Sequence, residues 1–311
     1  MTDGVRSRSR SLDVRSTTRP LPEAHKLHAS VAAKLGVASV QGTAPHALPW
    51  AASFFGLDRV RAFSALDVEA RESVVRACGR SLLVEAQGIE RLGLTYCAKM
   101  SLLSETTEER VAYSLMAADE AIHLALVSRH VEGEDTGDSP FLALLREAIE
   151  ERGKNVLTLL IQVVLEGWGL THYRRLAEGC QEPLLEQSLR RIRRDEAFHH
   201  GSGNLLFSPA ALGGEDETYV VEFLARVFRS VQIGPQSVAG VLERAHGGLT
   251  REGRAQVFAE LDTEADGARK IGTLHALLLR HDLSRVREAL ERRGVFTPFS
   301  PEACAAIAFG E

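Results

Sequence analysis

The feature that most constrains this chain is a duplicated motif with a fixed spacing. The pentapeptide DEAIH occupies residues 119–123, and DEAFH returns at residues 195–199, an offset of 76 residues. Upstream, Glu90 in ERLGLTY and Glu166 in EGWGLTHY are separated by the same offset. The chain therefore carries two copies of one unit, in which a glutamate is followed 30 residues later by Glu-x-x-His.

Helical geometry gives this unit a chemical meaning. A Glu and a His three residues apart lie about 300° around an α-helix, on one face and one turn apart. A glutamate 30 residues upstream, across a short loop, lies at the same height on an antiparallel neighbour. Two such hairpins facing each other offer four carboxylates and two imidazoles. This donor set suits two cations held close together and favours iron or manganese over calcium.

The remaining pattern predicts an all-α chain. Almost no alternating apolar pattern of the strand type is found, and the helix formers Ala, Leu, Arg and Glu are abundant. A Thr-x-x-Glu capping box at Thr106 and Glu109 opens one helix, Gly179 ends another, and Pro183 begins the next. We expect helices at about 80–103, 106–131, 140–152, 156–178 and 183–206, shorter ones at 23–36, 48–63 and 65–78, and three to five more up to Phe309.

The expected helix at 156–178 is apolar nearly all round, as VLTLLIQVVLEGWGL shows. Such a helix is buried at the centre of a fold. Glu166 lies in the middle of it, where a carboxylate is costly unless it is paired or bound to a metal. This residue therefore supports the metal-site interpretation independently of the repeat.

The duplicated motif resembles that of the ferritin-like dinuclear (diiron) carboxylate proteins, in their O2-activating oxygenase and oxidase branch. That family is built on a four-helix bundle, with one Glu from each of two helices and Glu-x-x-His from the other two. The resemblance covers about residues 79–208. It implies a ferritin-like four-helix bundle with additional N- and C-terminal helices, and it implies six metal-binding and catalytic residues: Glu90, Glu120, His123, Glu166, Glu196 and His199.

Two aspartates precede ligand-type glutamates. The resemblance implies that Asp119 accepts the free ring N–H of His199 and that Asp195 accepts that of His123, which would fix the tautomer of each ring. Solvated surface acids are the alternative. Some N-oxygenating relatives carry a further histidine one turn before the second Glu-x-x-His, but this chain has Ile192 there.

Several neighbouring residues leave alternatives open. Glu85 is a rival to Glu90, but five residues place it about 500° around the helix, so we favour Glu90 as the ligand. Gly93 and Gly169 each lie three residues after a ligand-type glutamate. They could serve close helix packing or leave room for O2 or substrate.

Three further side chains lie seven residues from a ligand-type glutamate: Tyr173, Cys97 and Tyr113. Such residues could line a channel or relay an electron, and each alone is more commonly part of the core.

The domain organisation follows from these elements. The first twenty residues contain five arginines among serines and threonines, which indicates a disordered basic tail at 1–20. We expect a helical segment at 21–78, the dimetal bundle at 79–208 and a helical extension at 209–311. Helices beyond a minimal bundle are a plausible wall for a substrate pocket.

Composition narrows the partners. The net charge of −5 argues against nucleic acid, and no apolar run reaches the roughly 20 residues that span a bilayer. Four scattered cysteines without CxxC indicate reduced thiols and a cytoplasmic protein. The oligomeric state stays open, with a homodimer among the alternatives.

The resemblance implies an enzyme with two iron ions, or manganese, and O2 as co-substrate. It would hydroxylate, N-oxygenate, desaturate or oxidatively cleave a small organic molecule, with electrons from a reductase or ferredoxin. One alternative is a ferroxidase or peroxidase that handles metal. The other is a regulatory scaffold without metal, which the cost of burying six ligand-type residues disfavours.

Overall fold

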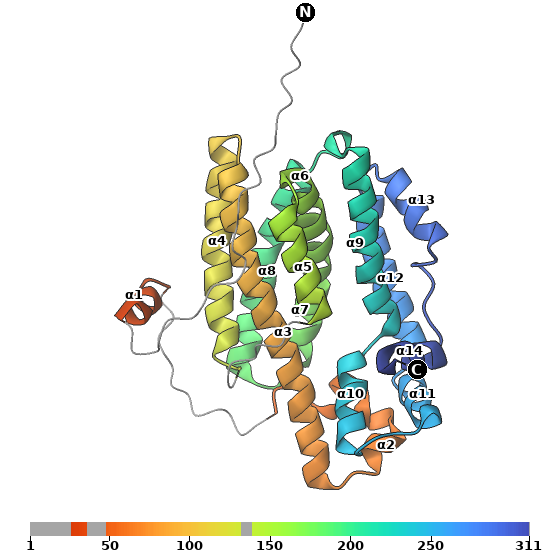
Figure 1. The fold of residues 1–311 in the computed structure, drawn as a ribbon. Coiled ribbons are helices and arrows are strands. Elements are labelled where there is room, and N and C mark those ends of the chain that lie inside the picture. The colour runs from red at the N-terminus through yellow and green to blue at the C-terminus, as the bar shows by residue number, and fades with distance from the viewer. Residues whose placement is uncertain (1–25, 36–47, 132–138, 311) are drawn as a thin grey trace, which may run out of the picture.

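The described fold is entirely helical. The structure is a computed structural model that describes residues 26–35, 48–131 and 139–310, and within these ranges the only extended pairing is one isolated bridge between Trp50 and Cys180. The prediction of an all-α chain is confirmed (Figure 1). The predicted tail at 1–20 and most of the predicted loop after residue 131 lie outside the described residues.

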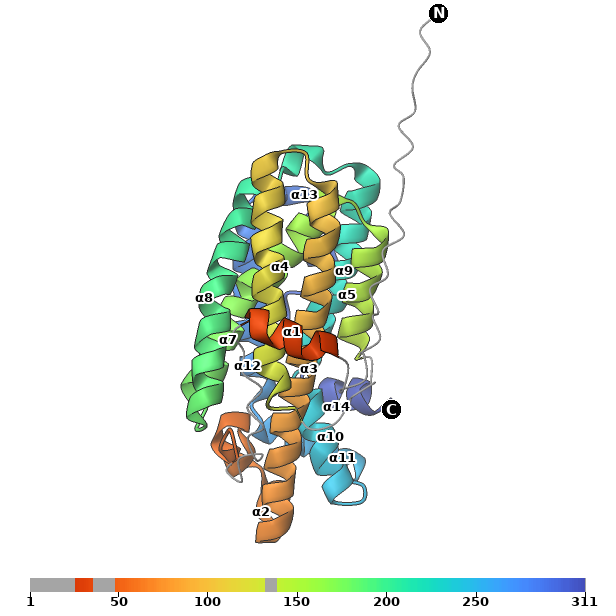
Figure 2. The same ribbon diagram turned by 90° about the vertical axis from the view of Figure 1, so that its left-hand side faces the viewer.

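Two antiparallel hairpins form the centre of the molecule (Figures 1 and 2). The first joins α3 (Val68–Leu103) to α4 (Thr107–Ser128). The second joins a long buried helix, which ends as α7 (Gly167–Gly179), to α8 (Pro183–Leu206). Helices α4 and α8 pack against each other, so the two copies of the repeat face one another.

The expected helix ends are confirmed where caps predicted them. The Thr106 hydroxyl accepts a hydrogen bond from the Glu109 backbone N–H at 3.2 Å and so begins α4. Ser139 caps α5 (Pro140–Glu151) in the same way through Leu142. Pro183 is the first residue of α8, as predicted.

The N-terminal half of α3 corrects one expectation. We predicted separate helices at 65–78 and 80–103, but α3 runs without a break through Gly79. A Cβ on Gly79 would lie 3.3 Å from the Trp50 ring. The glycine is therefore explained by close packing of Trp50 against the helix, and it does not end the helix.

The predicted helix at 48–63 is also wrong in detail. The chain forms two short 3₁₀ turns, η1 (Ala52–Phe55) and η2 (Leu57–Arg59), followed by α2 (Arg61–Ser64). Gly56 between the two turns has a φ of 74°, a left-handed conformation that interrupts a helix. The weak helix expected at 23–36 is present as α1 (Lys26–Leu35).

The buried helix at 156–178 is confirmed in place but not in geometry. It begins as α6 (Lys154–Leu157), continues as a π-helical segment, η3 (Thr158–Glu166), and returns to α-helix in α7. The residues from Thr158 to Val164 are all buried. Wide π turns occur inside α-helices mostly as short insertions and frequently at functional sites.

The C-terminal extension contains six helices, one more than the upper limit that we expected. They are α9 (Gly214–Ile233), α10 (Gln236–Ala245), α11 (Arg251–Glu260), α12 (Thr263–Leu279), α13 (Ser284–Arg292) and α14 (Pro301–Phe309), preceded by the 3₁₀ turn η4 (Pro209–Ala211). Side chains of α9 and α12 share one core cluster with η3. The extension thus covers the buried helix on the side away from α4 (Figure 1).

One buried lysine joins α5 to α3. The Lys99 ammonium donates hydrogen bonds to the backbone carbonyls of Ile149, Glu150 and Arg152 at 2.6, 3.2 and 2.9 Å. These carbonyls end α5 and have no partner within their own helix. Because a cation at a helix C-terminus also meets the negative end of the helix dipole, Lys99 fixes α5 against the bundle.

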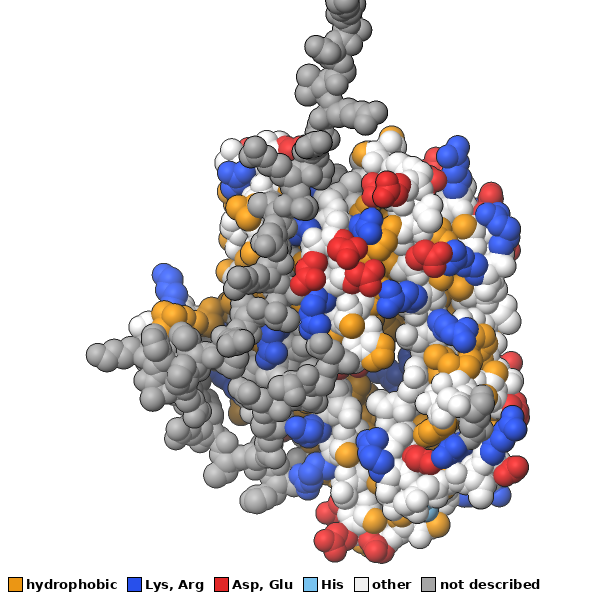
Figure 3. Space-filling model, in the orientation of Figure 1, with side chains coloured by type: hydrophobic (Ala, Val, Ile, Leu, Met, Phe, Trp, Pro, Cys, Tyr) orange, Lys and Arg blue, Asp and Glu red, His pale blue; other side chains and the backbone are white. Residues whose placement is uncertain are grey.

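Surface charge and helix hydropathy bear on the expectation that the protein binds neither nucleic acid nor a membrane. Among the side chains coloured in Figure 3, acidic and basic groups are interspersed on this face. One described helix, α4, is long and apolar enough by composition alone to cross a membrane, yet it carries Glu120 and His123 and belongs to the first hairpin. Core helices of globular proteins pass the same test, so the observation is weak.

The close approach of α8 to η3 predicts a specific cost for one methyl group. A Cβ on Gly203 would overlap the Cβ of Gln162, whereas a Cβ on Gly201 would meet nothing within 4 Å. We expect Gly203→Ala to lower the free energy of unfolding by about 1–3 kcal/mol through overpacking. The control Gly201→Ala should leave it unchanged or raise it, since alanine favours helix. Urea denaturation followed by circular dichroism measures both, and equal stability of the two variants would contradict the packing described here.

Candidate metal centre

The structure brings all six predicted ligands together from four helical segments. Glu90 comes from α3, Glu120 and His123 from α4, Glu166 from the end of η3, and Glu196 and His199 from α8. Their donor atoms form two groups, each with every atom within 4.8 Å of the others. The first group is Glu90, Glu120, His123 and Glu196, and the second is Glu120, Glu166 and His199.

Two carboxylates lie between the two groups. Glu120 belongs to both. Glu196 places one carboxylate oxygen 3.7 Å from Nδ1 of His123 and the other 3.6 Å from Nδ1 of His199. The glutamates of the two Glu-x-x-His motifs are thus central, and Glu90 and Glu166 lie at opposite ends. This is the arrangement that two neighbouring cations with bridging carboxylates require.

Three buried polar atoms at the centre lack any hydrogen-bond partner: Nδ1 of His123, Nδ1 of His199 and Oε2 of Glu166. Leaving such atoms unsatisfied in a protein interior is costly. All three are candidate metal-ligand atoms by residue type. The residues present therefore fit a dinuclear metal group, which would satisfy these atoms.

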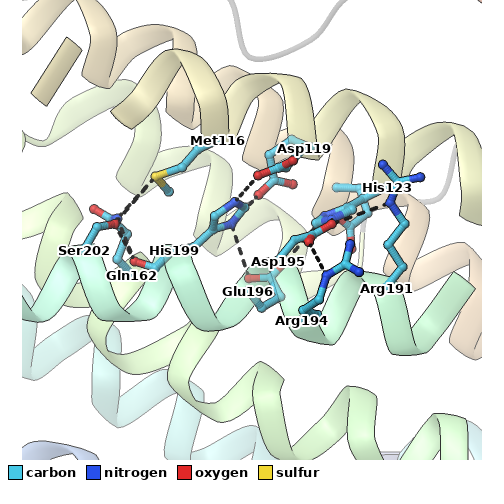
Figure 4. Close-up of polar contacts among 12 residues, drawn as sticks. Met116, Asp119, His123, Gln162, Arg191, Arg194, Asp195, Glu196, His199 and Ser202 are labelled. Atoms are coloured by element: carbon cyan, nitrogen blue, oxygen red, sulfur yellow. Dashed lines mark hydrogen bonds and ion pairs between the residues drawn. The ribbon is translucent and has the colours of Figure 1, made fainter. Parts of the chain in front are cut away.

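The two aspartates confirm the predicted cross-pairing (Figure 4). Nε2 of His123 lies 3.4 Å from Oδ2 of Asp195, and Nε2 of His199 lies 3.4 Å from Oδ2 of Asp119. A proton on Nε2 of each ring, donated to the aspartate, leaves the Nδ1 lone pair free for a metal. Arg194 holds Asp195 from the other side at 3.1 Å.

The negative charges of the clustered glutamates must be balanced by protons or cations. Burial, followed by the neighbouring carboxylates, raises the pKa of Glu166 well above its usual value. Burial likewise raises the pKa of Glu120. For His199, burial opposes protonation, but the nearby carboxylates of Asp119 and Glu120 outweigh it and raise the pKa. Without a cation, the cluster retains protons, and metal binding must displace them.

The structure supports Glu90 over its rival. Glu90 is 1% exposed and accepts a hydrogen bond from the Tyr173 hydroxyl. Glu85 is exposed and belongs to neither donor group. Tyr173, which we had left open between channel and core, is therefore in direct contact with a ligand.

One residue of the site was missed in the sequence. The side chain of Gln162 accepts hydrogen bonds from the hydroxyls of Tyr96 and Tyr113 at 2.8 and 3.0 Å. Its amide donates to the backbone carbonyl of His199 at 3.0 Å and to the Ser202 hydroxyl at 3.1 Å (Figure 4). Gln162 therefore fixes the turn of α8 that carries His199.

A signal for Gln162 was present. It is the one amide in the apolar run of the buried helix, four residues before Glu166 and so on nearly the same helix face. Its backbone carbonyl also accepts a hydrogen bond from Nδ1 of His200 at 3.0 Å, within the π-helical segment. His200 is not among the donor groups, which agrees with its position about 100° around α8 from His199.

A cavity of about 170 Å³ lies directly beside the centre. Its walls are mostly apolar, and its lining includes four of the ligand-type glutamates. The described apolar residues that line it are Leu82, Ala86, Ile89, Phe141, Leu145, Ile149, Ile161, Leu165 and Trp168. These residues come from α3, α5 and the long buried helix.

Both glycines that we left open line this cavity. A Cβ on Gly93 would lie 2.5 Å from a carboxylate oxygen of Glu120, so a side chain there would displace a ligand. A Cβ on Gly169 would meet nothing within 4 Å. Gly93 is thus required by the position of Glu120, and Gly169 leaves space in the cavity. Cys97 is fully buried and is not among the lining residues.

Comparison with family models, with curated proteins and with solved structures found no match to this chain. The structure shows an all-α fold and a buried Glu/His cluster that could hold metal ions.

Removal of a ligand should lower the metal content. Glu120→Ala removes the carboxylate common to both groups, and His199→Ala removes the only imidazole of the second group. We expect fewer than two metal ions per chain in each variant, by elemental analysis after anaerobic loading. Glu85→Gln is the matched control and should retain two. Two metals per chain in either ligand variant would contradict the assignment.

The aspartate contacts predict an indirect effect. Asp119→Asn keeps the size of the side chain but weakens its hold on the ring of His199, so metal affinity should fall by about 10- to 100-fold. Competition with a chromophoric chelator measures this affinity. Glu108→Gln, an exposed acid on the same helix, should leave it unchanged. Equal affinities for the two variants would show that Asp119 is an ordinary surface acid.

Proposed function

We propose that this protein is a ferritin-like dinuclear iron enzyme that uses O2 to oxidise a small organic molecule. The observation that carries the proposal is the position of the cavity. Its apolar walls end on Glu90, Glu120, Glu166 and Glu196, so a molecule inside it would lie against the metal ions.

The protein's own residues would do three things. The four glutamates and two histidines would hold two ions, with Glu120 and Glu196 between them. Asp119 and Asp195 would orient the histidines. Tyr173 would hold a proton at Oε1 of Glu90, where its hydroxyl already donates a hydrogen bond. When bound, the two irons would supply the redox chemistry with O2.

The donor set fits iron, with manganese as the alternative. Carboxylates with imidazole suit iron or manganese, and thiolates, which would favour zinc or copper, are absent from the two donor groups. Reducing O2 with two irons also needs electrons from outside, and a reductase or ferredoxin would supply them. The reaction would be a hydroxylation, N-oxygenation, desaturation or oxidative cleavage.

A metal-handling ferroxidase or peroxidase is the rival function. It needs iron access to the centre but no organic pocket. The cavity is of the size that accepts small organic molecules, because a dry protein cavity of about 150 Å³ binds benzene. This comparison supports the oxygenase or oxidase over the rival.

Oxygen consumption separates the two functions. We expect the diferrous protein with a chemical reductant to consume O2 repeatedly, and a fitting small molecule to raise the rate. Trp168→Ala enlarges the cavity without removing a ligand-type residue, so it should change the response to that molecule while two irons stay bound. Single-turnover oxidation of iron, with iron accumulating beyond two per chain and no effect of any organic molecule, would identify a ferroxidase instead.

A further inference from the structure

The cavity has one polar feature that the metal ligands do not explain. Five carboxylates line it, and four of them belong to the candidate metal centre. The fifth is Glu85 of α3. No lysine or arginine is among the described residues that line the cavity. An apolar chamber next to two metals therefore carries a single spare negative group.

Glu85 lies away from the metals, towards solvent. It precedes Glu90 by five residues, which is about 7.5 Å of rise along an α-helix. Its side chain is exposed, whereas that of Glu90 is not. The metal ligands thus mark the floor of the cavity, and Glu85 marks its mouth.

His172 also lines the cavity. The hydrogen bonds of Tyr96 with Gln162 and of Tyr173 with Glu90 show that the long buried helix runs antiparallel to α3. His172 precedes Tyr173, whose hydroxyl contacts Glu90, so it lies near the height of Glu90 along α3. His172, six residues after Glu166, lines the cavity and is exposed as Glu85 is.

Glu85 has no partner of its own within the described chain. It forms no hydrogen bond or ion pair with another described residue. The walls around it partly remove it from bulk water and raise its pKa, and no nearby cation counters that effect. A carboxylate left without a partner beside an apolar cavity is suited to a cationic group that arrives with a ligand.

A neutral His172 would not compete with a cationic ligand for Glu85, and its ring could accept a hydrogen bond. Although its side chain is exposed to solvent, the surrounding protein first, and then the charges of Lys270 and Arg175, lower the pKa of His172 to about 4. It is therefore neutral at pH 7. Neither of those cations lines the cavity, and Lys270 is paired with Asp266 at 2.6 Å.

We propose that Glu85 is the substrate anchor of this site and binds the protonated amino group of a small amine. The apolar body of the amine, about the size of one six-membered ring or a short aliphatic chain, would fill the cavity between Glu85 and the metals. This inference rests on the proposed function and names its substrate class. Apolar walls attract a ligand without orienting it, so one charged contact at the mouth determines which atom faces the metals.

A matched set of probes tests the anchor by binding alone. Benzylamine, benzyl alcohol and benzoate share one ring and differ in charge, and titration calorimetry measures their affinity for protein loaded with two redox-inert zinc ions. The wild-type protein should bind benzylamine more tightly than benzyl alcohol, and benzoate least. Glu85→Gln should weaken benzylamine binding by roughly five- to tenfold and leave benzyl alcohol unchanged.

Glu72→Gln is the matched control, because it removes the same charge from the same helix at an exposed position outside the cavity. It should bind all three probes as the wild type does. Unchanged benzylamine binding in Glu85→Gln, tightest binding of benzoate, or no saturable binding of benzylamine to the wild type would each overturn the inference.

The same measurement separates this inference from the proposed function. If the protein loads two irons and consumes O2 but Glu85→Gln binds benzylamine normally, the anchor is wrong and the function stands. If the protein does not react with O2, the difference between wild type and Glu85→Gln in the zinc-loaded or metal-free protein still decides whether Glu85 binds amines.

Discussion

Four carboxylates gathered at one centre, three of them buried and Glu166 half-buried, repel one another, and this repulsion is the constraint on which the rest of the structure depends. Glu90, Glu120 and Glu196 are all nearly inaccessible to solvent. Such a cluster is stable only with protons or cations between its members. Nδ1 of His123, Nδ1 of His199 and Oε2 of Glu166 have no hydrogen-bond partner, and cations bound among these atoms would satisfy all three. The two hairpins, the aspartates behind the histidines and Gln162 all serve to hold these donors in place.

The clustering of the six ligand-type residues could be predicted from the sequence because helical periodicity is local. A spacing of three places Glu120 beside His123 on any α-helix, and the equal offset of the two copies predicts that they meet. The pairing of each aspartate with a histidine was predicted from the family resemblance alone. Features that depend on contacts between distant parts of the chain could not be predicted from the sequence. A helix break at Gly79 was predicted because the sequence does not show Trp50 packed against it. Gln162 was missed because its side-chain partners come from three other helices.

The cavity depends both on local helical periodicity and on tertiary packing. The repeated motif supplies the ligand-type glutamates that line the cavity. The other lining residues include those of α5, which Lys99 holds through three backbone carbonyls, and those of the long buried helix with its π-helical turns. The C-terminal helices cover that helix from outside. Glu85 illustrates the limit of counting along a helix. Counting placed it on a different helix face from Glu90, and it belongs to neither donor group, yet both residues line the same cavity.

The most direct test of the account is a crystal structure of the iron-loaded protein with anomalous data at the iron edge. Two anomalous peaks about 3.5–4 Å apart are expected. One should lie against Glu90 and His123 and the other against Glu166 and His199, with Glu120 and Glu196 between them. No peak among these six side chains, or iron bound only elsewhere on the chain, would contradict the central claim.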